Sequence, residues 1–360
     1  MASSLPRVFA SWSDSGTSST TPVSAEPSAA GPSRTERGAI RGAGRAERGP
    51  GGTRRSVERS EESTRLPIGL AVCIGLTYRT FDSDFYRDAT VPELAAPPHD
   101  VAAMKSLLER GEQEPRFAVR RLLDQDATHQ EILASIRWAA LGQAGVGPGL
   151  QAGDLFVLSF SGHGVALTAA GGDEPHDQAW CLYDNLLLDD ELAELWPLFS
   201  PGVRVVVVSD SCHSGTMLRE VSPAWLQRLR SEPDLARRLA TLRPRQIPPA
   251  TLSLLTRQHA AELADRRTPR AERSNQLARL SATVLLLAAC QDDQLANEFP
   301  EGGAFTTALT TVCRSEPPPA GYATAVTQAA QRIELPNQTP RFERLGPTAP
   351  AFEQSAPFRL

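Results

Sequence analysis

A cysteine and a histidine each follow a run of apolar residues, and together they could act as a nucleophile and its base. Cys212 comes after "VVVVSDS" and His163 comes after "LFVLSFSG". Runs of this length and composition are typical of buried strands in a parallel sheet. If the two strands are neighbours, their carboxyl ends present the thiol and the imidazole to one cleft. The imidazole can then take the proton of the thiol as the sulfur attacks a substrate.

Each residue also has an ordinary structural explanation. A single cysteine after a strand is usually a small core residue, and a single histidine there is usually held by hydrogen bonds. The catalytic interpretation is favoured because both residues stand among small residues where two apolar runs end. The glycines beside them leave room for a substrate, and the N–H groups of Gly164 and Cys212 can hold an oxyanion. His213 is the weaker candidate base, because adjacent side chains diverge.

Five apolar runs predict the strands that carry these residues. The runs alternate with segments whose apolar residues recur at helical spacing, which predicts an α/β fold with a mostly parallel sheet covered on both faces. Thr128 and Glu131 form the T-x-x-E pattern of a helix N-terminus. The predicted strands are 68–76, 117–123, 154–161, 203–209 and 282–289, and the predicted helices are 98–110, 128–140, 189–198, 303–314 and 322–332.

Composition divides the chain into a tail, a folded domain and a short C-terminal tail. The first part is rich in Ser, Gly, Pro and Arg and poor in apolar residues, so we expect it to be disordered. An arginine-rich insertion with several prolines interrupts the folded domain. The expected parts are a tail at 1–65, a domain at 66–345 and a C-terminal tail at 346–360. Within the domain we expect a larger part at 66–220, a linker or insertion at 221–280 and a smaller part at 281–345.

The bulk properties of the 360 residues exclude several classes of protein. A net charge of −5 does not suggest a nucleic acid as the main partner. The 5 cysteines have no C-x-x-C spacing, which argues against a disulfide framework and a structural zinc site and favours a reducing cytosol. No apolar run has the length of a membrane helix or of the core of a signal peptide. We therefore expect a cytoplasmic protein without a membrane partner, and a monomer.

The residues around His163 and Cys212 resemble the caspase-type cysteine peptidases, and specifically the metacaspases. "FSGHG" and "DSCHSG" lie at the spacing of about 50 residues noted for caspases. The resemblance implies a caspase-like fold with a central, mostly parallel six-stranded sheet, and a cysteine endopeptidase in which Cys212 attacks and His163 moves the proton. Further matching stretches are "LAVCIGLTY", "PPHDVAAMKSLL", "DATHQEILASI", "HDQAWCLYD", "LLLDDEL", "LLLAACQDDQLANE", "GGAFTTAL" and "NQTPRFE".

The resemblance also implies which residues select the substrate. In metacaspases the positions that match Asp100, Ser161 and Asp210 line the pocket for the residue before the cleaved bond. Two carboxylates in a half-buried pocket favour a guanidinium or an ammonium group. We therefore expect protein or peptide substrates with Arg or Lys before the cleaved bond. Taken alone, Asp210 would be a turn or cap residue and Asp100 a helix N-cap, and these roles are compatible with a pocket role.

In this family the linker between the two halves can be cut by the enzyme itself, so we expect self-processing in the arginine-rich insertion. The alternative explanation is compositional, because arginine is the general basic residue of this chain and its presence in a loop proves little. The candidate cleavage sites follow Arg228, Arg230, Arg237, Arg238, Arg266, Arg267 and Arg270.

Three acidic residues, Asp177, Asp189 and Asp190, match positions that bind calcium in metacaspases. Carboxylate oxygens suit Ca²⁺. The family site also takes an Asp seven residues after the nucleophile, where this chain has Arg219. Two alternatives follow. Either Arg219 replaces the ion as a fixed cation and no cofactor is required, or Arg219 faces solvent and the three acids bind Ca²⁺ weakly.

Two other functions are compatible with the same fold. A catalytically silent scaffold or signalling module would be marked by loss of the Cys–His pair, and both residues are present. A hydrolase or transferase that acts on small amides could use the same pair. Turnover of arginyl peptides distinguishes the endopeptidase from both.

Overall fold

The computed structural model describes residues 65–79, 81, 83–110, 117–144, 147–167, 177–212, 227 and 230–360, although the side chains of residues 270 and 271 are not described. The disordered tail expected at 1–65 therefore lies outside the described residues, apart from Arg65. From residue 67 onward the described chain forms one compact unit.

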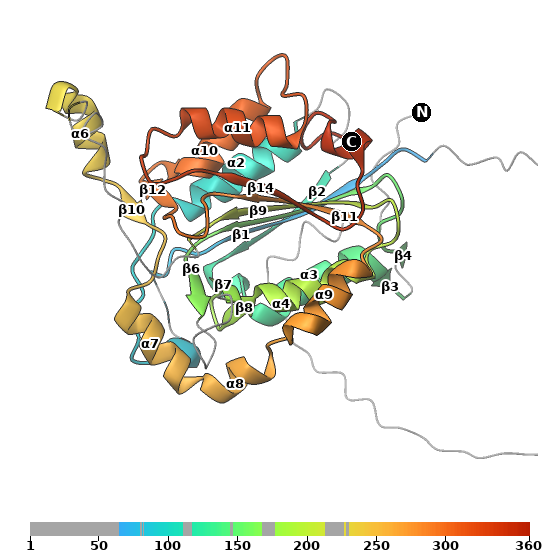
Figure 1. Cartoon of the computed structure of the whole chain (residues 1–360), viewed down its shortest axis with the longest axis horizontal. Helices are drawn as coiled ribbons and strands as arrows, with labels where there is room; N and C mark the ends of the chain where they lie inside the picture. The colour runs from blue at the N-terminus through green and yellow to red at the C-terminus, as the bar shows by residue number, and fades with distance from the viewer. Residues whose placement is uncertain are drawn as a thin grey trace, which may run out of the picture. The chain divides into compact units, whose positions relative to one another are not determined.

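A six-stranded sheet crosses the centre of this unit (Figure 1). Its strand order is β14-β11-β9-β5-β1-β2, and β14 alone runs antiparallel to its neighbour. The predicted α/β fold with a mostly parallel six-stranded sheet is confirmed. The strands are β1 (Gly69–Gly75), β2 (Phe117–Leu123), β5 (Leu155–Ser161), β9 (Arg204–Asp210), β11 (Thr283–Ala288) and β14 (Arg341–Leu345).

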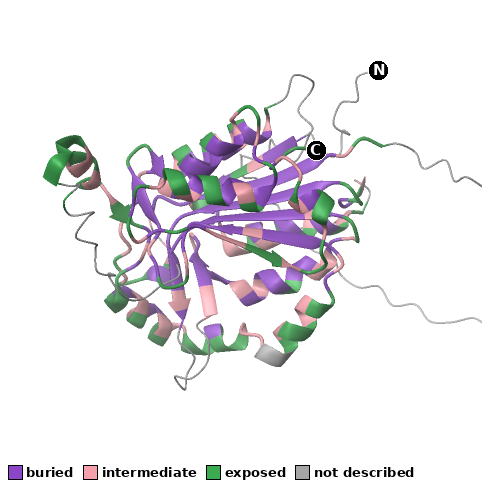
Figure 2. Cartoon of the chain, turned by 45° about the horizontal axis from the view of Figure 1, so that its top comes forward, coloured by how far each residue is buried: buried purple, intermediate pink, exposed green. Residues whose placement is uncertain are grey.

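Helices cover both faces of the sheet, which explains why its inner strands are apolar without alternation. Along β9, Val205 and Val207 join one hydrophobic cluster, and Val206 and Val208 join the other. The strands are buried accordingly (Figure 2). One face carries α2 (Pro97–Leu108), α10 (Ala304–Cys313) and α11 (Tyr322–Arg332); the other carries α3 (His129–Leu141), α4 (Asp189–Leu195) and α9 (Arg270–Ala278) (Figure 1).

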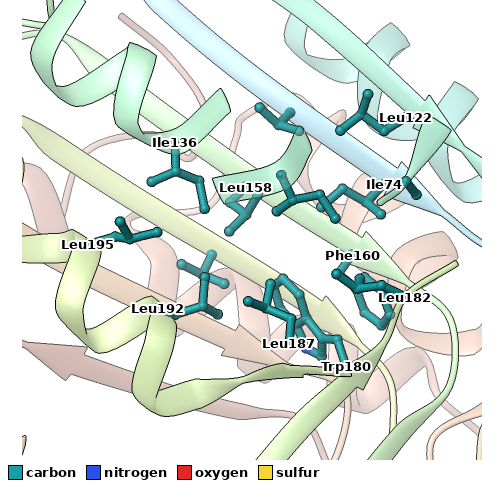
Figure 3. Packing of buried hydrophobic residues seen from close by; sticks show 14 of the residues in the cluster. Ile74, Leu122, Ile136, Leu158, Phe160, Trp180, Leu182, Leu187, Leu192 and Leu195 are labelled. Atoms are coloured by element: carbon teal, nitrogen blue, oxygen red, sulfur yellow. The ribbon is translucent and has the colours of Figure 1, made fainter. Parts of the chain in front are cut away.

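The end of β5 is held by aromatic packing on the face that carries α3 and α4 (Figure 3). The rings of Phe160 and Trp180 stack with their centroids 4.4 Å apart and an angle of 3° between their planes. The Trp180 indole Nε1–H donates to Ser209 Oγ over 3.0 Å, so the ring pair also ties β5 to the end of β9. The carboxyl ends of these two strands are therefore fixed against each other.

Among the described residues, no helix is long and apolar enough to cross a membrane.

The remaining elements are short and lie around the central sheet. The short strands are β3 (Gly142–Gln143), β4 (Gly147–Pro148), β6 (Gly164–Leu167), β7 (Asp177–Cys181), β8 (Leu186–Leu188), β10 (Arg243–Pro244), β12 (Asn297–Phe299) and β13 (Gly302–Gly303). The 3₁₀ turns are η1 (Asp84–Tyr86), η2 (Asp124–Asp126) and η3 (Trp196–Leu198).

The arginine-rich insertion is mostly helical. Its helices are α6 (Pro233–Leu239), α7 (Pro249–Gln258), α8 (Ala260–Asp265) and α9. Helix α6 has no buried residue and stands away from the sheet (Figures 1 and 2). By contrast, Ile247 and Leu255 are buried in the same core as the central sheet. The two ends of the insertion are thus attached to the domain very differently.

Two parts of the C-terminal region differ from the expectation from sequence. Strand β14 was not among the predicted strands, because its sequence "RFERL" contains no apolar run. The strand lies at the edge of the sheet and pairs only with β11. Residues 346–360, expected to be a tail, pack against the domain through α12 (Pro350–Glu353) and through the buried rings of Phe352 and Phe358. The Phe358 N–H donates to the hydroxyl of buried Tyr322 over 3.0 Å.

Candidate active site

The register of the sheet places the two candidate catalytic residues at the same edge. Strands β5 and β9 are parallel neighbours, and Ser161 pairs with Asp210 at their ends. His163 and Cys212 each lie two residues further along. Their side chains therefore leave the sheet together, as expected for neighbouring strands. Both residues are completely buried, with no exposed surface.

His163 is held as a neutral base with one nitrogen available. Its Nε2 lies 2.8 Å from the carbonyl oxygen of Pro92, which can only accept, so Nε2 carries the proton and Nδ1 is left as the acceptor. Nδ1 has no hydrogen-bond partner. Burial lowers the pKa of His163 to about 4, against the opposing effect of the Pro92 and Arg245 carbonyls. The imidazole is therefore uncharged at neutral pH.

Tyr78 holds both the ring and the backbone of His163 in position. The two ring centroids are 4.6 Å apart. The Tyr78 hydroxyl accepts the backbone N–H of His163 over 2.8 Å and donates to the carbonyl of Cys181 over 2.8 Å. The histidine backbone and ring are thus both constrained, and Tyr78 and Pro92 are positioning residues that the sequence did not indicate.

Cys212 is a neutral thiol in this state. Its Sγ donates to the carbonyl of Ala296 over 3.1 Å and lies 2.9 Å from the N–H of the same residue. Burial raises the pKa of the thiol well above its ordinary value, and the backbone N–H groups of Ala296 and Arg245 act in the opposite direction. Neither ring nitrogen of His163 hydrogen-bonds to Sγ. His163 and Cys212 therefore both lie beside the backbone of Arg245, but no hydrogen bond joins the imidazole to the thiol.

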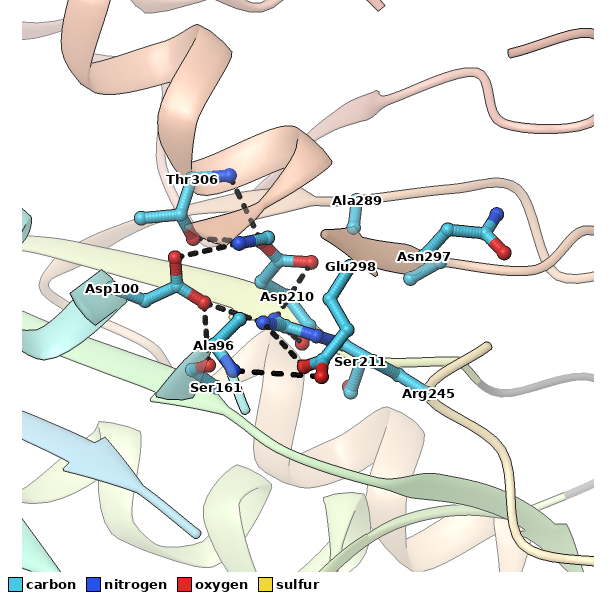
Figure 4. A network of polar contacts seen from close by, with 12 residues as sticks. Ala96, Asp100, Ser161, Asp210, Ser211, Arg245, Ala289, Asn297, Glu298 and Thr306 are labelled. Atoms are coloured by element: carbon cyan, nitrogen blue, oxygen red, sulfur yellow. Dashed lines mark hydrogen bonds and ion pairs between the residues drawn. The ribbon is translucent and has the colours of Figure 1, made fainter. Parts of the chain in front are cut away.

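The three residues that are expected from the sequence to select the substrate, Asp100, Ser161 and Asp210, meet in one buried cluster (Figure 4). Asp100 accepts a hydrogen bond from Ser161 Oγ over 2.7 Å. Asp210 accepts from both the N–H and the hydroxyl of Thr306, over 2.9 and 2.7 Å, and so also caps the first turn of α10. Asp100 and Asp210 therefore both accept structural hydrogen bonds within this buried cluster.

The guanidinium of Arg245 fills the space between these acids (Figure 4). It lies 2.5 Å from Asp100 Oδ2 and 3.4 Å from Glu298 Oε2. It contacts Asp210 twice, with a hydrogen bond of 2.7 Å to its carbonyl oxygen and an ion pair of 3.0 Å to Oδ1 that is not aligned as a hydrogen bond. Arg245 has no exposed surface. Sequence reasoning missed both Arg245 and Glu298.

Three carboxyl groups face a single buried guanidinium, so acidic groups outnumber the cation in this cluster. Burial raises the pKa of Asp210 above its ordinary value, and Arg245 opposes that shift. The pKa of Glu298 is raised for the same reason and opposed by the same guanidinium. A buried charge needs a partner of opposite sign. The buried cluster therefore requires a cation, and Arg245 supplies it.

The backbone around Arg245 crosses the site as an extended segment. Strand β10, just before it, pairs antiparallel with β12. The Arg245 N–H donates to the carbonyl of Ala296 over 2.9 Å, and its carbonyl oxygen accepts from the N–H of Gly164 over 3.3 Å. Gln246 forms an isolated parallel bridge with Gly164. A side chain at Gly164 would collide with the carbonyl of Cys212, so this close approach requires glycine.

The candidate calcium residues lie elsewhere, and arginines occupy their oxygens. Arg267 Nε is 2.8 Å from Asp177, while Arg273 is 2.5 Å from Asp189 and 2.9 Å from Asp190. Burial raises the pKa of Asp189, and Arg273 opposes that shift. Within the described residues no group of His, Cys, Asp and Glu is arranged to hold a metal ion. These residues do not fit a calcium ion as they stand. Arg219 lies outside the described residues, as does His213.

The arginines predicted as self-cleavage sites fall into three groups. Arg230, Arg237 and Arg238 are exposed on and before α6. Arg266 and Arg267 are held in ion pairs with Glu191 and Asp177. Arg228 and the side chain of Arg270 are outside the described residues. The described candidates are exposed or pair with other acids, whereas the backbone of Arg245 lies beside both Cys212 and His163.

Residues 68–354 match the family model described as the caspase domain. The chain is 34% identical to Metacaspase-4 of Arabidopsis thaliana over 156 residues, which cover 42% of this chain and 34% of that protein. It is 27% identical to Metacaspase-1 of Yarrowia lipolytica over 197 residues, which cover 51% of this chain and 41% of that protein. The chain thus spans well under half the length of these curated relatives. Among solved structures it resembles protein GSU0716 from Geobacter sulfurreducens, with a TM-score of 0.61 and 31% identity over 81% of this chain and 98% of that one.

Proposed function

The chain belongs to the caspase domain family, in which its curated relatives are metacaspases, and we propose that it is a cysteine endopeptidase that cuts after Arg or Lys. One observation carries the proposed specificity. A guanidinium, that of Arg245, lies in the cluster of Asp100, Ser161 and Asp210, and Asp210 stands two residues before Cys212. Because the five cysteines are free thiols, we also propose the cytoplasm as its compartment.

The proposed reaction follows the order of acyl transfer. Cys212 Sγ attacks the carbonyl carbon of the basic residue, and Nδ1 of His163 takes the thiol proton. The N–H groups of Gly164 and Cys212 hold the oxygen that becomes negatively charged. His163 then gives its proton to the leaving amine, and water hydrolyses the thioester. The Pro92 carbonyl keeps Nε2–H in place throughout, so that Nδ1 is the nitrogen that moves protons.

Selection of a basic side chain follows from the charge of the pocket. Asp100, Asp210 and Glu298 offer three carboxyl groups around one guanidinium. Hydrogen bonds to charged partners contribute about 1.5–3 kcal/mol each, so two of them correspond to a preference of roughly 100-fold or more over an uncharged side chain. An aspartate in the same place would meet like charges. The proposed preference is thus for Arg and Lys and against Asp.

A scan of the residue before the cleaved bond tests this proposal. In a series of fluorogenic peptides that differ only at that position, we expect kcat/KM for Arg and Lys to exceed that for Leu and Asp at least about 100-fold, because only a cation pairs with the pocket. The Cys212→Ala variant is the blank. Silence with every peptide, together with a thiol that reacts with an alkylating agent, would favour a scaffold. Turnover of small amides and of no peptide would favour a hydrolase or transferase that acts on small amides.

We also propose that activity is independent of calcium, because each of the three acids already pairs with Arg267 or Arg273. A calcium chelator is expected to leave peptide hydrolysis within about twofold of its starting value. Removing the fixed cation in Arg273→Ala leaves Asp189 and Asp190 without that partner, so added Ca²⁺ should raise the unfolding temperature of this variant and not of the wild type.

Arg279→Ala is the matched control for this experiment, since Arg279 follows α9 and is exposed. Thermal unfolding of the three proteins with and without Ca²⁺ measures the effect. Complete loss of wild-type activity in the chelator, restored by added Ca²⁺, would contradict the proposal.

A further inference from the structure

A second buried thiol lies beside the candidate nucleophile and has no part in the proposed reaction. Cys290 is 2% exposed and belongs to the same hydrophobic cluster as Cys212. Free cysteines are among the most buried residue types, so burial alone assigns no role to a thiol. The other three cysteines, Cys73, Cys181 and Cys313, are buried as well. What distinguishes Cys290 from them is its place relative to the nucleophile.

The register of two neighbouring strands brings the two cysteines together. Strands β9 and β11 are parallel, and Ser209 pairs with Ala288 near their carboxyl ends. The contact continues beyond β11, because the N–H of the residue after Ala288 donates to the carbonyl of Ser209 over 2.9 Å. Two residues beyond this pair, Ser211 lies opposite Cys290, whose Sγ is 3.8 Å from the Ser211 carbonyl oxygen. Cys212 is the next residue of the chain.

The two sulfur atoms also contact the same turn after β11. Sγ of Cys290 lies 3.4 Å from the carbonyl oxygen of Gln294, and Sγ of Cys212 hydrogen-bonds to the backbone of Ala296, two residues later. Burial raises the pKa of the Cys212 thiol, and the neighbouring Cys290 thiol raises it further. The two thiols are therefore neighbours held by one short stretch of backbone.

The spacing of the backbone permits a bond between these two sulfur atoms. Neighbouring strands lie about 4.8 Å apart, and successive residues rise about 3.3 Å along a strand, so a residue one position past its opposite number is about 6 Å away between Cα atoms. Disulfides span about 4.4–6.8 Å between Cα atoms. By contrast, Cys73 lies on β1, which β5 separates from β9, and Cys181 belongs to the cluster on the other face of the sheet.

We propose that Cys290 is the resolving thiol of a reversible oxidation site at Cys212: a peroxide oxidises the nucleophile, and Cys290 captures the oxidised sulfur as a disulfide. The inference rests on the proposed peptidase function, because the base that activates Cys212 for a peptide also activates it for a peroxide. Cys212 has no exposed surface, so the site must open to admit a substrate. An opening that admits a peptide also admits hydrogen peroxide, which is far smaller.

The two chemical steps balance with the peroxide as the oxidant. In the first, Sγ of Cys212 attacks one oxygen atom, the O–O bond breaks, and a sulfenic acid forms while the peroxide gains two electrons. The thiol proton passes to His163 and then to the departing hydroxide, which leaves as water. In the second step, Sγ of Cys290 attacks the sulfenic sulfur and the S–O bond breaks. The hydroxyl group takes the Cys290 proton and leaves as a second water molecule.

Capture by Cys290 protects the nucleophile from irreversible damage. A sulfenic acid without a neighbouring thiol reacts with more peroxide to sulfinic and sulfonic acids, which thiols do not reduce. The disulfide stops at the first stage of oxidation. It also holds Sγ of Cys212 away from a substrate, so the oxidised protein should be inactive until a dithiol exchanges with the disulfide.

Treatment of the full chain with hydrogen peroxide tests the inference. In the wild type we expect loss of arginyl-peptide hydrolysis, a mass lower by two hydrogen atoms, and a peptide map that links Cys212 to Cys290. Dithiothreitol should restore hydrolysis to within about twofold of its starting rate. In Cys290→Ala the loss should be permanent, with less than about a tenth of the rate restored and a mass higher by two or three oxygen atoms.

Cys313→Ala is the matched control, because Cys313 is buried in the same hydrophobic cluster at the end of α10. It should behave as the wild type does. Cys290→Ser keeps the size of the side chain and is the second variant, so that a cavity left by alanine does not decide the result. Without peroxide, all three variants should hydrolyse the peptide within about twofold of the wild-type rate.

The outcomes separate this inference from the proposed function, because mass and peptide map do not depend on activity. A disulfide between Cys212 and Cys290 in folded protein that cuts no peptide would overturn the peptidase function and leave the oxidation site standing. Full recovery of Cys290→Ala in dithiothreitol, a bond from Cys212 to a different cysteine, or permanent loss of activity in the wild type would overturn the role of Cys290. Activity that peroxide leaves unchanged would overturn it as well.

Discussion

Replacing Cys212 by alanine is expected to lower kcat/KM for arginyl peptides at least about 1,000-fold, because no other group can form the thioester. The fold should survive the change. Sγ hydrogen-bonds to the backbone of Ala296, and the net loss of a hydrogen bond costs about 1 kcal/mol. Peptide hydrolysis and thermal unfolding of the same preparation measure the two effects. His163→Ala should cause a comparable loss of activity that does not add to the first.

Cys290→Ala is the matched control. Cys290 is also a buried cysteine after a strand of the central sheet, and its Sγ lies 3.4 Å from the carbonyl of Gln294. Removing this thiol creates a similar small cavity but should leave kcat/KM within about twofold. The assignment of the nucleophile would be wrong if Cys290→Ala abolished hydrolysis and Cys212→Ala retained it.

Asp210→Asn is expected to abolish most of the preference for arginine. The amide keeps the shape of the side chain and can still accept from Thr306, but it removes one charge from the pocket. We expect kcat/KM for an arginyl peptide to fall about 100-fold while that for a leucyl peptide changes little, so that the ratio of the two reports on the pocket. The intact protein should also lose stability, because Arg245 loses one of its three acidic partners.

The expected loss of stability is about 1–3 kcal/mol. Breaking a buried ion pair costs about 3–5 kcal/mol when the charge left behind is uncompensated. Here Asp100 and Glu298 still face Arg245, so the cost should be smaller. Asp292→Asn is the control, since this exposed acid pairs with Arg341 on the surface. An unchanged ratio of arginyl to leucyl hydrolysis in Asp210→Asn would show that Asp210 does not select the substrate.

The strands of the central sheet that are buried on both faces were all predicted from the sequence, and so was the edge strand β2, whereas the edge strand β14 was not. A buried strand in a parallel sheet must be apolar along its length, and this leaves a local pattern such as the four valines of β9. Strand β14 is only partly buried and carries Arg341, Glu343 and Arg344, so its pairing with β11 leaves no such pattern. The burial of Phe352 and Phe358 likewise depends on a contact with distant Tyr322.

The same distinction applies to the candidate site. The sequence by itself determined the types of residue that stand at two strand ends, and so indicated Cys212 and His163, while the resemblance indicated the acids proposed to select the substrate. Only the tertiary structure decided which cation each acid meets. Arg245 is one of many arginines in the insertion, and no neighbouring residue in the sequence distinguishes it from the others. Its partners Asp100 and Glu298 lie far from it along the chain. Ion pairs between distant segments are chosen by the packing of the whole domain, because a charge can be buried only where the fold brings an opposite charge to it.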